Sequence, residues 1–233
     1  MDMGYIRVAI DGPAGAGKST VAKKVAEMFQ MEYIDTGAMY RAVTWGIIHE
    51  NIPLDDEPQL RRFLQSLQLA VRYRADGRQQ VWLNGKEISD CIRSPQVTGL
   101  VSVVAARPAV RERLVELQRE IARRKCVIMD GRDIGTVVFP DADVKFFITA
   151  SLEVRAMRRY RELLARGHHT DYEAVKQELH ERDEMDSGRA HSPLQPATDA
   201  IILDTSEMTL AEVVERVSET IRRVKRGEQP CIT

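Results

Sequence analysis

Gly12-Pro13-Ala14-Gly15-Ala16-Gly17-Lys18-Ser19 is the stretch that decides the fold of this chain. It fits the pattern G-x-x-x-x-G-K-[ST] at every constrained position. The apolar run Ile6 to Ile10, interrupted only by Arg7, predicts a buried strand before it, and apolar residues recur at helical spacing from Ser19 to Phe29 after it. Strand, glycine-rich loop and helix, in this order, are the context of a phosphate-binding loop, or P-loop.

The residue types in this loop suit a nucleoside triphosphate. Glycines let backbone N–H groups turn inward around a polyphosphate, and the helix N-terminus adds its positive end. Lys18 is expected to reach the β- and γ-phosphates, and the Ser19 hydroxyl to ligate Mg²⁺. A glycine-rich turn with a chance Lys-Ser pair is the alternative, and the flanking strand and helix disfavour it.

Length and composition limit the possible domain organisation, partners and location of the chain only broadly. At 233 residues the chain suits one α/β domain with inserts or two small domains, and its formal net charge of -1 gives no argument for nucleic acid or membrane partners. Cys91, Cys126 and Cys231 lack C-x-x-C spacing, so we expect reduced thiols, with Cys126 in the core of a strand. We expect no secretory signal before the first strand, no membrane span and a cytoplasmic location.

Apolar, β-branched segments alternate with helical ones along most of the chain. Strands are expected at 6–10, 33–34, 127–129, 144–148 and 200–203, and helices at about 19–29, 108–123, 151–166, 171–183 and 209–225. Thr209 and Glu212 have capping-box spacing, and Gly167 is placed to end its helix. This alternation predicts an α/β fold, a doubly wound parallel sheet covered on both faces.

One segment breaks the rhythm. Alternating apolar residues from Leu67 to Tyr73 predict a strand with one wet face, and the turn signals Asp76-Gly77 and Asn84-Gly85 flank the apolar run Val81-Trp82-Leu83. The sequence predicts a three-stranded antiparallel meander, inserted between about 60 and 106.

Arginine follows two of the predicted strands, in the polar, glycine-containing segments Asp35–Arg41 and Asp130–Gly135. Ligands of open parallel sheets lie beyond the carboxyl ends of the strands, so both segments should lie near the P-loop. A phosphate acceptor is itself anionic, and arginine suppresses repulsion between two anions. Arg41 and Arg132 therefore favour a phosphate acceptor, and a solvated loop residue is the alternative for each.

The segment from about 151 to 190 is rich in charge. Its first helix, 151–166, holds five arginines against two glutamates, and charged residues crowd the stretch 181–189. We interpret the segment as a mobile basic cover over phosphates, and a solvated helix face is the alternative.

Several of these motifs together resemble bacterial cytidylate kinases. The resemblance rests on the P-loop, on Asp35–Arg41, on Arg182-Asp183 with Asp186 and Arg189, and most specifically on the run Asp130–Ala142. It extends over nearly the whole chain. It implies a P-loop kinase core of residues 1–60, 106–150 and 190–233, a nucleoside-monophosphate-binding insert at 60–106, and a helical lid at 151–190.

The resemblance also implies the reaction. The γ-phosphoryl group of ATP would pass to CMP or dCMP by direct in-line transfer with Mg²⁺, giving ADP and CDP or dCDP in pyrimidine metabolism. The expected partners are these small molecules alone, for a monomer without nucleic acid or membrane contacts. The implied ATP-binding residues are Gly12, Pro13, Ala14, Gly15, Ala16, Gly17, Lys18, Ser19 and Thr20.

Residues for the acceptor are carried over by position. Thr36, which stands where some members have Ser, would bind the CMP phosphate and its surroundings together with Arg41 and Arg132. Arg189 would lie close to the transferred group, so that Lys18, Arg132 and Arg189 form the implied catalytic set. The remaining implied residues are Ser102, Arg111 and Asp133 for cytosine, Arg182 and Asp186 for the ribose and phosphate side, and Arg155 and Arg159 in the lid.

The base assignment agrees with simple hydrogen-bond chemistry. Cytosine presents its N4 amine as a donor and N3 and O2 as acceptors, so a carboxylate suits the first and a guanidinium the others. A cap or turn residue is the alternative for Asp133, because Asp is common in turns that follow strands.

Other P-loop functions stay open at the level of sequence. A kinase for UMP, AMP or a small alcohol would share the loop. A GTP-dependent switch would carry an N-K-x-D element, but the closest string, Asn84-Gly85-Lys86-Glu87, falls in a predicted hairpin turn. An ATP-driven motor module would need a partner-binding extension, for which the sequence gives no support.

Overall fold

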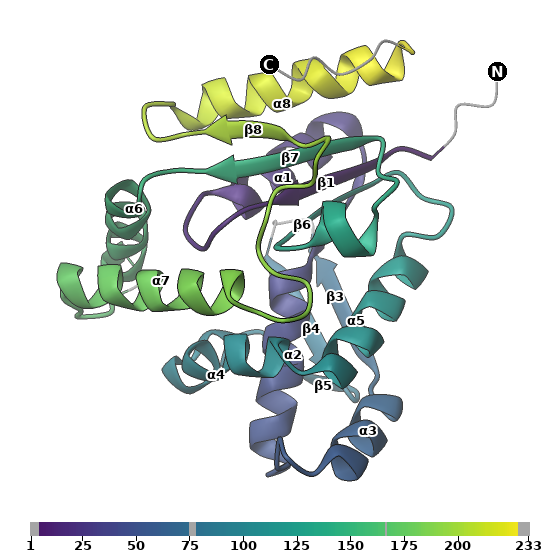
Figure 1. Ribbon diagram of the computed structural model, residues 1–233, viewed down its shortest axis with the longest axis vertical. Helices are drawn as coiled ribbons and strands as arrows, with labels where there is room; N and C mark the ends of the chain where they lie inside the picture. Colours follow the sequence, from purple (N-terminus) through teal and green to yellow (C-terminus); the bar gives the residue numbers. More distant parts are fainter. Residues whose placement is uncertain (1–4, 75–77, 166, 228–233) are drawn as a thin grey trace. The chain divides into compact units, whose positions relative to one another are not determined.

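A computed structural model describes residues 5–74, 78–165 and 167–227 of the chain (Figure 1). The chain divides into two compact units, Met1–Tyr33 with Ala122–Thr233, and Ile34–Ile121. The turn signal Asp76-Gly77 and the cysteine Cys231 lie outside the described residues. None of the helices within those ranges is both long and apolar enough to cross a membrane.

A five-stranded sheet of order β2-β6-β1-β7-β8 forms the base of the first unit, and only the last two residues of β2, Ile34 and Asp35, are counted with the second unit. Its strands are β1 (Arg7–Asp11), β2 (Glu32–Asp35), β6 (Val127–Gly131), β7 (Val144–Thr149) and β8 (Ile201–Asp204). β1 pairs in parallel with β6 and β7, and β7 with β8. The predicted doubly wound parallel sheet is confirmed, and its central strand β1 leads directly into the P-loop.

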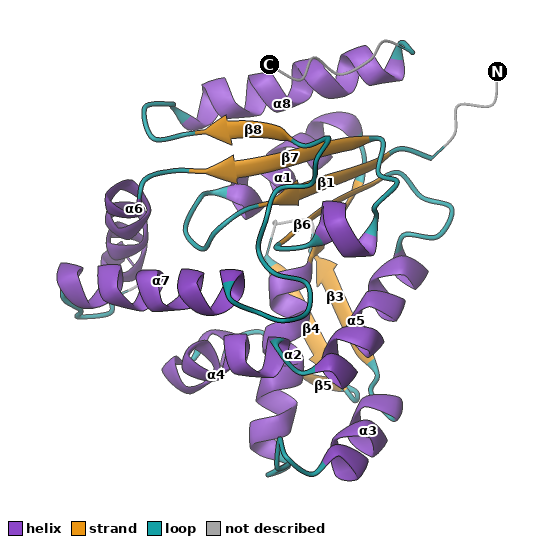
Figure 2. Ribbon diagram, in the orientation of Figure 1, coloured by secondary structure: helices purple, strands orange, loops and turns teal. Residues whose placement is uncertain are grey.

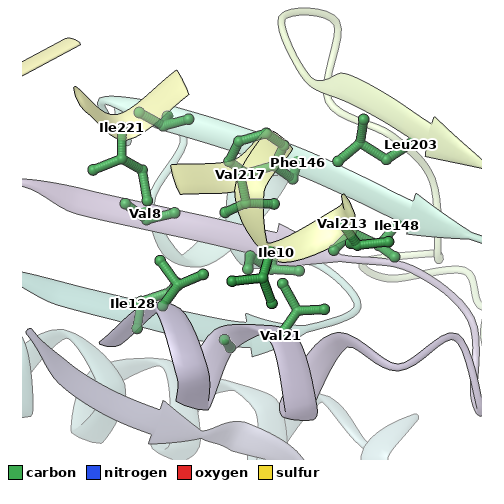
Figure 3. Close-up of a cluster of buried hydrophobic side chains, with 14 of the residues drawn as sticks. Val8, Ile10, Val21, Ile128, Phe146, Ile148, Leu203, Val213, Val217 and Ile221 are labelled. Atoms are coloured by element: carbon green, nitrogen blue, oxygen red, sulfur yellow. The ribbon is translucent and has the colours of Figure 1, made fainter. Parts of the chain in front are cut away.

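Helices α1 (Lys18–Phe29) and α8 (Leu210–Lys225) pack on this sheet through a shared apolar cluster. Figure 3 shows Val8 and Ile10 of β1, Phe146 of β7 and Val217 of α8 turned toward one another. Burying one such side chain contributes about 1.5–3 kcal/mol. The predicted capping box starts α8, with Thr209 N–H donating to the Glu212 carboxylate at 2.7 Å and Glu212 N–H donating to the Thr209 hydroxyl at 3.3 Å.

Two further helices of the first unit pack side by side (Figure 2), α6 (Leu152–Ala165) and α7 (Tyr172–Ser187). Ala156 of α6 and Val175 and Leu179 of α7 form a small apolar cluster with Ala14 of the P-loop. Asp171 caps α7 by accepting a hydrogen bond from Ala174 N–H at 3.1 Å. These helices are the predicted pair, and the second continues beyond its expected end at 183.

The second unit contains the predicted antiparallel meander. Its sheet has the order β3-β4-β5, with β3 (Leu69–Tyr73), β4 (Gln79–Leu83) and β5 (Lys86–Glu87). Asn84 and Gly85, at φ 49° and 80°, turn the chain between β4 and β5. The N-K-x-D-like string therefore lies in a hairpin, as predicted, and α2 (Thr36–His49), α3 (Glu57–Gln65), α4 (Pro95–Ala105) and α5 (Pro108–Ile121) complete the unit.

The structure corrects three expectations. The segment after Asp35 is helix α2 and not a polar loop, so Arg41 lies in its second turn; the side chain of Asp35 caps this helix by accepting from Ala38 N–H at 2.8 Å. Helices α3 and α4 were not expected within or beside the insert. Cys126 lies just before β6 and is only partly buried, not in the strand core.

Candidate active site

The P-loop joins the end of β1 to the start of α1, as the sequence predicts. Gly12, Gly15 and Gly17 have φ values of 145°, 76° and 86°, where side chains other than hydrogen are strained. A Cβ on Gly12 would lie 2.0 Å from the carbonyl oxygen of Ile148 in β7. Glycine is therefore required where the loop passes β7. The loop leads into the N-terminus of α1, and together they are suited to bind an anion.

Lys18 is buried at the base of this loop, with 5% of its surface exposed. Its ammonium group donates to the carbonyl oxygen of Pro13 at 2.7 Å. Burial, and after it the positive charge of Arg132, lowers the pKa of Lys18 to about 7. A polyphosphate would supply the opposite charge and favour the protonated amine.

Ser19 shares a carboxylate with Tyr33. The Ser19 hydroxyl donates to Asp130 Oδ2 at 2.7 Å, and the Tyr33 hydroxyl donates to Asp130 Oδ1 at 2.8 Å. Hydroxyl and carboxylate oxygens suit Mg²⁺, which binds nucleotide sites through one or two protein ligands and substrate phosphates. Within the described ranges no group of three or more His, Cys, Asp or Glu could hold a metal by itself. Ser19 and Asp130 thus fit a magnesium ion shared with a nucleotide.

Three arginines interact with a buried carboxylate, Asp186 of α7: Arg132 directly after β6, Arg182 in α7 and Arg189 just after α7. Asp186 is 1% exposed and accepts from Arg132 Nε at 2.8 Å and from the Arg189 guanidinium. Burial alone would raise the pKa of Asp186, but the charges of Arg132, Arg189 and Arg182 outweigh it and lower the pKa below 3.8. Three guanidinium groups thus surround one carboxylate.

Arg182 has the least complete pairing of the three. Its buried Nε has no hydrogen-bond partner among the described residues, and burial together with the charge of Arg132 lowers its pKa to about 10. An anionic ligand would relieve both the missing hydrogen bond and the repulsion between guanidinium groups. The cluster is therefore a candidate phosphate site.

The two arginines expected in the lid behave differently. Arg155 Nη1 donates to the carbonyl oxygen of Ala14 at 3.0 Å and to Asp183 Oδ2 at 2.6 Å. Ala14 N–H in turn donates to Asp183 Oδ1 at 3.4 Å, so the Arg155–Asp183 pair joins α6 and α7 to the P-loop. Arg159 instead pairs with Glu162 on its own helix at 3.0 Å. Only Arg155 is brought to the loop.

Asp133 follows Arg132 and is 3% exposed. The chain then enters a π-helical turn, Ile134–Val138, whose first two N–H groups donate to the carboxylate of Asp11. Asp11 closes β1 immediately before the P-loop. Sequence reasoning missed Asp11, Tyr33 and the role of Asp130, although an acidic residue near the end of a buried strand is a visible signal for Asp130.

In the second unit the expected acceptor residues lie on three helices. Thr36 is the first residue of α2, and both Ser102 of α4 and Arg111 of α5 are buried, at 4% and 5% exposure. Arg41 Nη1 donates to the Thr98 hydroxyl at 2.8 Å. The guanidinium of Arg111 lies 5.6 Å from the centre of the Tyr40 ring, which attaches α5 to α2.

The family to which the chain belongs follows from one match. The sequence profile of the family described as cytidylate kinase matches residues 8–223. The chain belongs to the cytidylate kinase family. Its membership agrees with the P-loop, the sheet order and the arginine cluster described above.

Relatives within the cytidylate kinase family cover almost the whole chain. A cytidylate kinase of Caldanaerobacter subterraneus subsp. tengcongensis is 52% identical over 223 residues, or 96% of this chain and 97% of the relative. One from Carboxydothermus hydrogenoformans is 50% identical over 218 residues, 94% and 98% of the two chains.

Solved structures are similar in fold alone. The crystal structure of an uncharacterized protein from Eubacterium ventriosum has a TM-score of 0.52 at 13% identity, and the match covers 93% of this chain and 98% of that one. This likeness supports the fold and carries no argument about the reaction.

Proposed function

We propose that this chain transfers the γ-phosphoryl group of ATP to CMP or dCMP, giving ADP and CDP or dCDP. Family membership supports this reaction. The observation that carries it is the buried cluster of Arg132, Arg182 and Arg189 around Asp186, close enough to Lys18 for Arg132 to lower its pKa. Positive charge beside a P-loop suits an acceptor that is itself a phosphate.

The donor end of the site is the P-loop, with Gly12 to Thr20 around the triphosphate. Lys18 exchanges the Pro13 carbonyl oxygen for the β- and γ-phosphates, where its charge stabilises the transferred group. Ser19 and Asp130 would hold Mg²⁺, which would neutralise charge on the phosphates. Because the transfer is direct, it needs no covalent intermediate.

The acceptor phosphate is bound by Thr36, Arg41 and Arg132. Arginine forms strong, charge-assisted hydrogen bonds with phosphate, which offset the repulsion between donor and acceptor. Arg189 stabilises the transferred group, and Arg182 with Asp186 addresses the ribose and phosphate side. Support for these roles is the burial and mutual pairing of Arg132, Asp186 and Arg189.

The base is read by Asp133, Arg111 and Ser102. A carboxylate accepts from the cytosine amine, whereas uracil would place an acceptor against the negative charge. Two acceptors facing each other in a buried site are both left without a hydrogen bond, which rejects a near-isostere strongly. The burial of all three side chains supports this role.

The proposal extends to the organisation of the molecule. Residues 60–106 form the nucleoside-monophosphate insert, residues 151–190 a lid, and the remainder of the chain the P-loop core. Closing the lid excludes water, which would otherwise compete as acceptor, and Arg155 and Arg159 contribute to this cover. We further propose a cytoplasmic monomer without nucleic acid or membrane partners.

A coupled assay of ADP release tests the proposed function. With ATP and Mg²⁺, we expect turnover with CMP and dCMP, and kcat/KM for UMP and AMP lower by at least about tenfold. Equal or greater efficiency with UMP or AMP would assign another acceptor. GTP hydrolysis without phosphorylation of any acceptor would instead favour a switch protein.

A further inference from the structure

Asp11 makes a two-pronged contact with the turn that follows Asp133. Its Oδ1 accepts from Ile134 N–H at 2.8 Å, and its Oδ2 accepts from Gly135 N–H at 2.7 Å. Asp11 is 3% exposed, so water does not compete for either bond. The contact joins residues 123 and 124 positions apart in the chain.

This geometry requires a carboxylate. Two neighbouring N–H donors need two acceptor oxygens, and an ionised Asp supplies both. An Asn of the same shape supplies one oxygen and presents its NH₂ group to the other N–H, which leaves that donor buried and without a hydrogen bond. The Asp11 side chain therefore holds the backbone N–H groups of Ile134 and Gly135 at the same time.

The turn is enclosed on its other side as well. A Cβ on Gly135 would lie 3.1 Å from Lys145 Cδ and 3.4 Å from Asp11 Oδ2. Lys145 is itself held, because its ammonium group donates to the Pro140 carbonyl oxygen at 2.6 Å and to Asp199 at 2.9 Å. The backbone directly after Asp133 thus has little room to move.

We propose that Asp11 is a positioning residue for base selection: by holding the N–H groups of Ile134 and Gly135, it fixes the Asp133 carboxylate against the cytosine amine. The inference rests on the proposed function, in which Asp133 reads the base. This role needs no contact between Asp11 and the substrate. Asp11 contributes to base selection only by fixing the position of the Asp133 carboxylate.

The environment of Asp11 disfavours its charged form, which the two N–H donors stabilise. Burial raises the pKa of Asp11 to about 7, the hydrogen bonds from Gly135 and Ile134 oppose this, and the negative charge of Asp133 adds to the rise. The two carboxylates are therefore close enough to interact. A buried carboxylate that served only to pack would be disfavoured by this burial.

Asp11→Asn tests the proposal through the ratio of kcat/KM for CMP to that for UMP. Losing one positioning hydrogen bond is expected to narrow this ratio by about fivefold or more. Loss of stability alone lowers both efficiencies equally and leaves the ratio unchanged. Where turnover falls too low, calorimetric Kd values for CMP and UMP give the same comparison.

Asp143→Asn is the matched control. Asp143 accepts from Arg7 N–H at 2.7 Å, so the same substitution removes a carboxylate contact with the other end of β1. We expect the control to keep the wild-type ratio. If Asp11→Asn does not fold, Gly135→Ala takes its place. Its added Cβ would lie 3.1 Å from Lys145 Cδ, so the turn must shift beside Asp11, which should narrow the ratio too.

A double variant separates positioning from an independent effect. If Asp11 acts through Asp133, the double variant that carries Asp11→Asn and Asp133→Asn should have the same CMP-to-UMP ratio of kcat/KM as Asp133→Asn alone. A ratio in the double variant that is narrowed by the product of the two single effects would overturn the proposal. An unchanged ratio in Asp11→Asn, beside a narrowed one in Asp133→Asn, overturns it and leaves the proposed function intact. A wild type without preference for CMP overturns both.

Discussion

At the scale of single residues, the candidate active site is a set of buried charges that hold one another in place. Lys18 and Asp186 are 5% and 1% exposed, and the pKa of each is lowered, the first by burial and the second by its arginine neighbours. Because protein groups and not water surround them, a bound anion changes their energetics directly.

Replacing Lys18 removes the main positive charge of the P-loop. We expect Lys18→Ala to fold and to reduce phosphoryl transfer at least about a hundredfold, as for loss of a charge-stabilising donor. Lys24→Ala, an exposed lysine on the same helix, is the control and should keep wild-type turnover. Near-normal CMP phosphorylation by purified Lys18→Ala would disprove the loop assignment.

Asp186 should make stability depend on pH. Because its folded pKa lies below 3.8, its contribution to the free energy of unfolding is present above about pH 4 and is lost as the pH falls through the folded value. Asp186→Asn leaves Arg132 and Arg189 buried without their carboxylate, which costs on the order of 3 kcal/mol at pH 7.

Urea unfolding of the wild type and of Asp186→Asn at several pH values measures how the free energy of unfolding of each protein depends on pH. The difference between the two proteins should shrink as the pH falls below about 4. Glu57→Gln is the control, because Glu57 and its partner Arg61 are 51% and 48% exposed, and its cost should stay under about 1 kcal/mol. A difference that does not vary with pH would contradict the assigned role of Asp186.

At the scale of elements, local signals predicted the strand, P-loop and helix that begin the fold. Gly12 shows why the loop pattern is strict. Its φ of 145° and the carbonyl oxygen of Ile148, 2.0 Å from the site of a Cβ, leave no place for a side chain. The same position joins β1 to the end of β7.

Gly12→Ala should therefore weaken the sheet as well as the loop. Overpacking and a strained φ each cost about 1–3 kcal/mol, and we expect the free energy of unfolding to fall by at least about 2 kcal/mol relative to Gly85→Ala. Gly85 also has a positive φ, at 80°, but open space around its Cβ position. Equal unfolding midpoints in urea for the two variants would refute the argument.

The elements that the sequence did not reveal have physical reasons for their weak signals. Helix α2 is buried on most of its surface, so it lacks the polar face that makes helical periodicity visible. Helix α3 has only nine residues, although Asp56 caps it and Pro58 stands in its first turn. Ser94 caps helix α4 and Pro95 is its first residue, which is a typical helix start. This signal was overlooked because it falls within the residues assigned to the meander.

In the candidate site, too, some features could be predicted from the sequence and others could not. The P-loop residues follow from a local pattern, and the roles of most other site residues come from the family resemblance. The contacts of Asp130 with Tyr33 and of Asp11 with Ile134 join residues 97 and 123 positions apart. No local pattern contains such contacts. The place of β2 beside β6 in the sheet brings Tyr33 to Asp130, and the pairing of β1 with β6 brings Asp11 to the turn after β6.

At the scale of the whole molecule, the proposed acceptor residues are divided between the two compact units. Arg132 belongs to the unit that contains the P-loop, and Arg41 to the unit Ile34–Ile121. Each is anchored within its own unit, Arg132 by Asp186 and Arg41 by Thr98. The role of each arginine can therefore be tested by a substitution within its own unit.

Arg41→Ala and Arg132→Ala should each weaken the use of CMP far more than the binding of ATP. Losing a charge-assisted contact with phosphate costs on the order of 2–4 kcal/mol in kcat/KM for CMP. Arg61→Ala, an exposed arginine paired with Glu57 and Glu112, is the control and should leave both unchanged. Loss of ATP binding with intact CMP binding, by calorimetry, would show that the division into donor and acceptor residues is wrong.

The fate of the γ-phosphoryl group tests the central claim most directly. With ATP labelled in its γ-phosphate, CMP and Mg²⁺, chromatography should find the label in CDP at the rate at which ADP appears, and the Lys18→Ala variant should form at least about a hundredfold less labelled CDP. Label found only in inorganic phosphate, or in an acceptor other than CMP or dCMP when several compete, would contradict the assignment of this chain as a kinase of cytidine monophosphates.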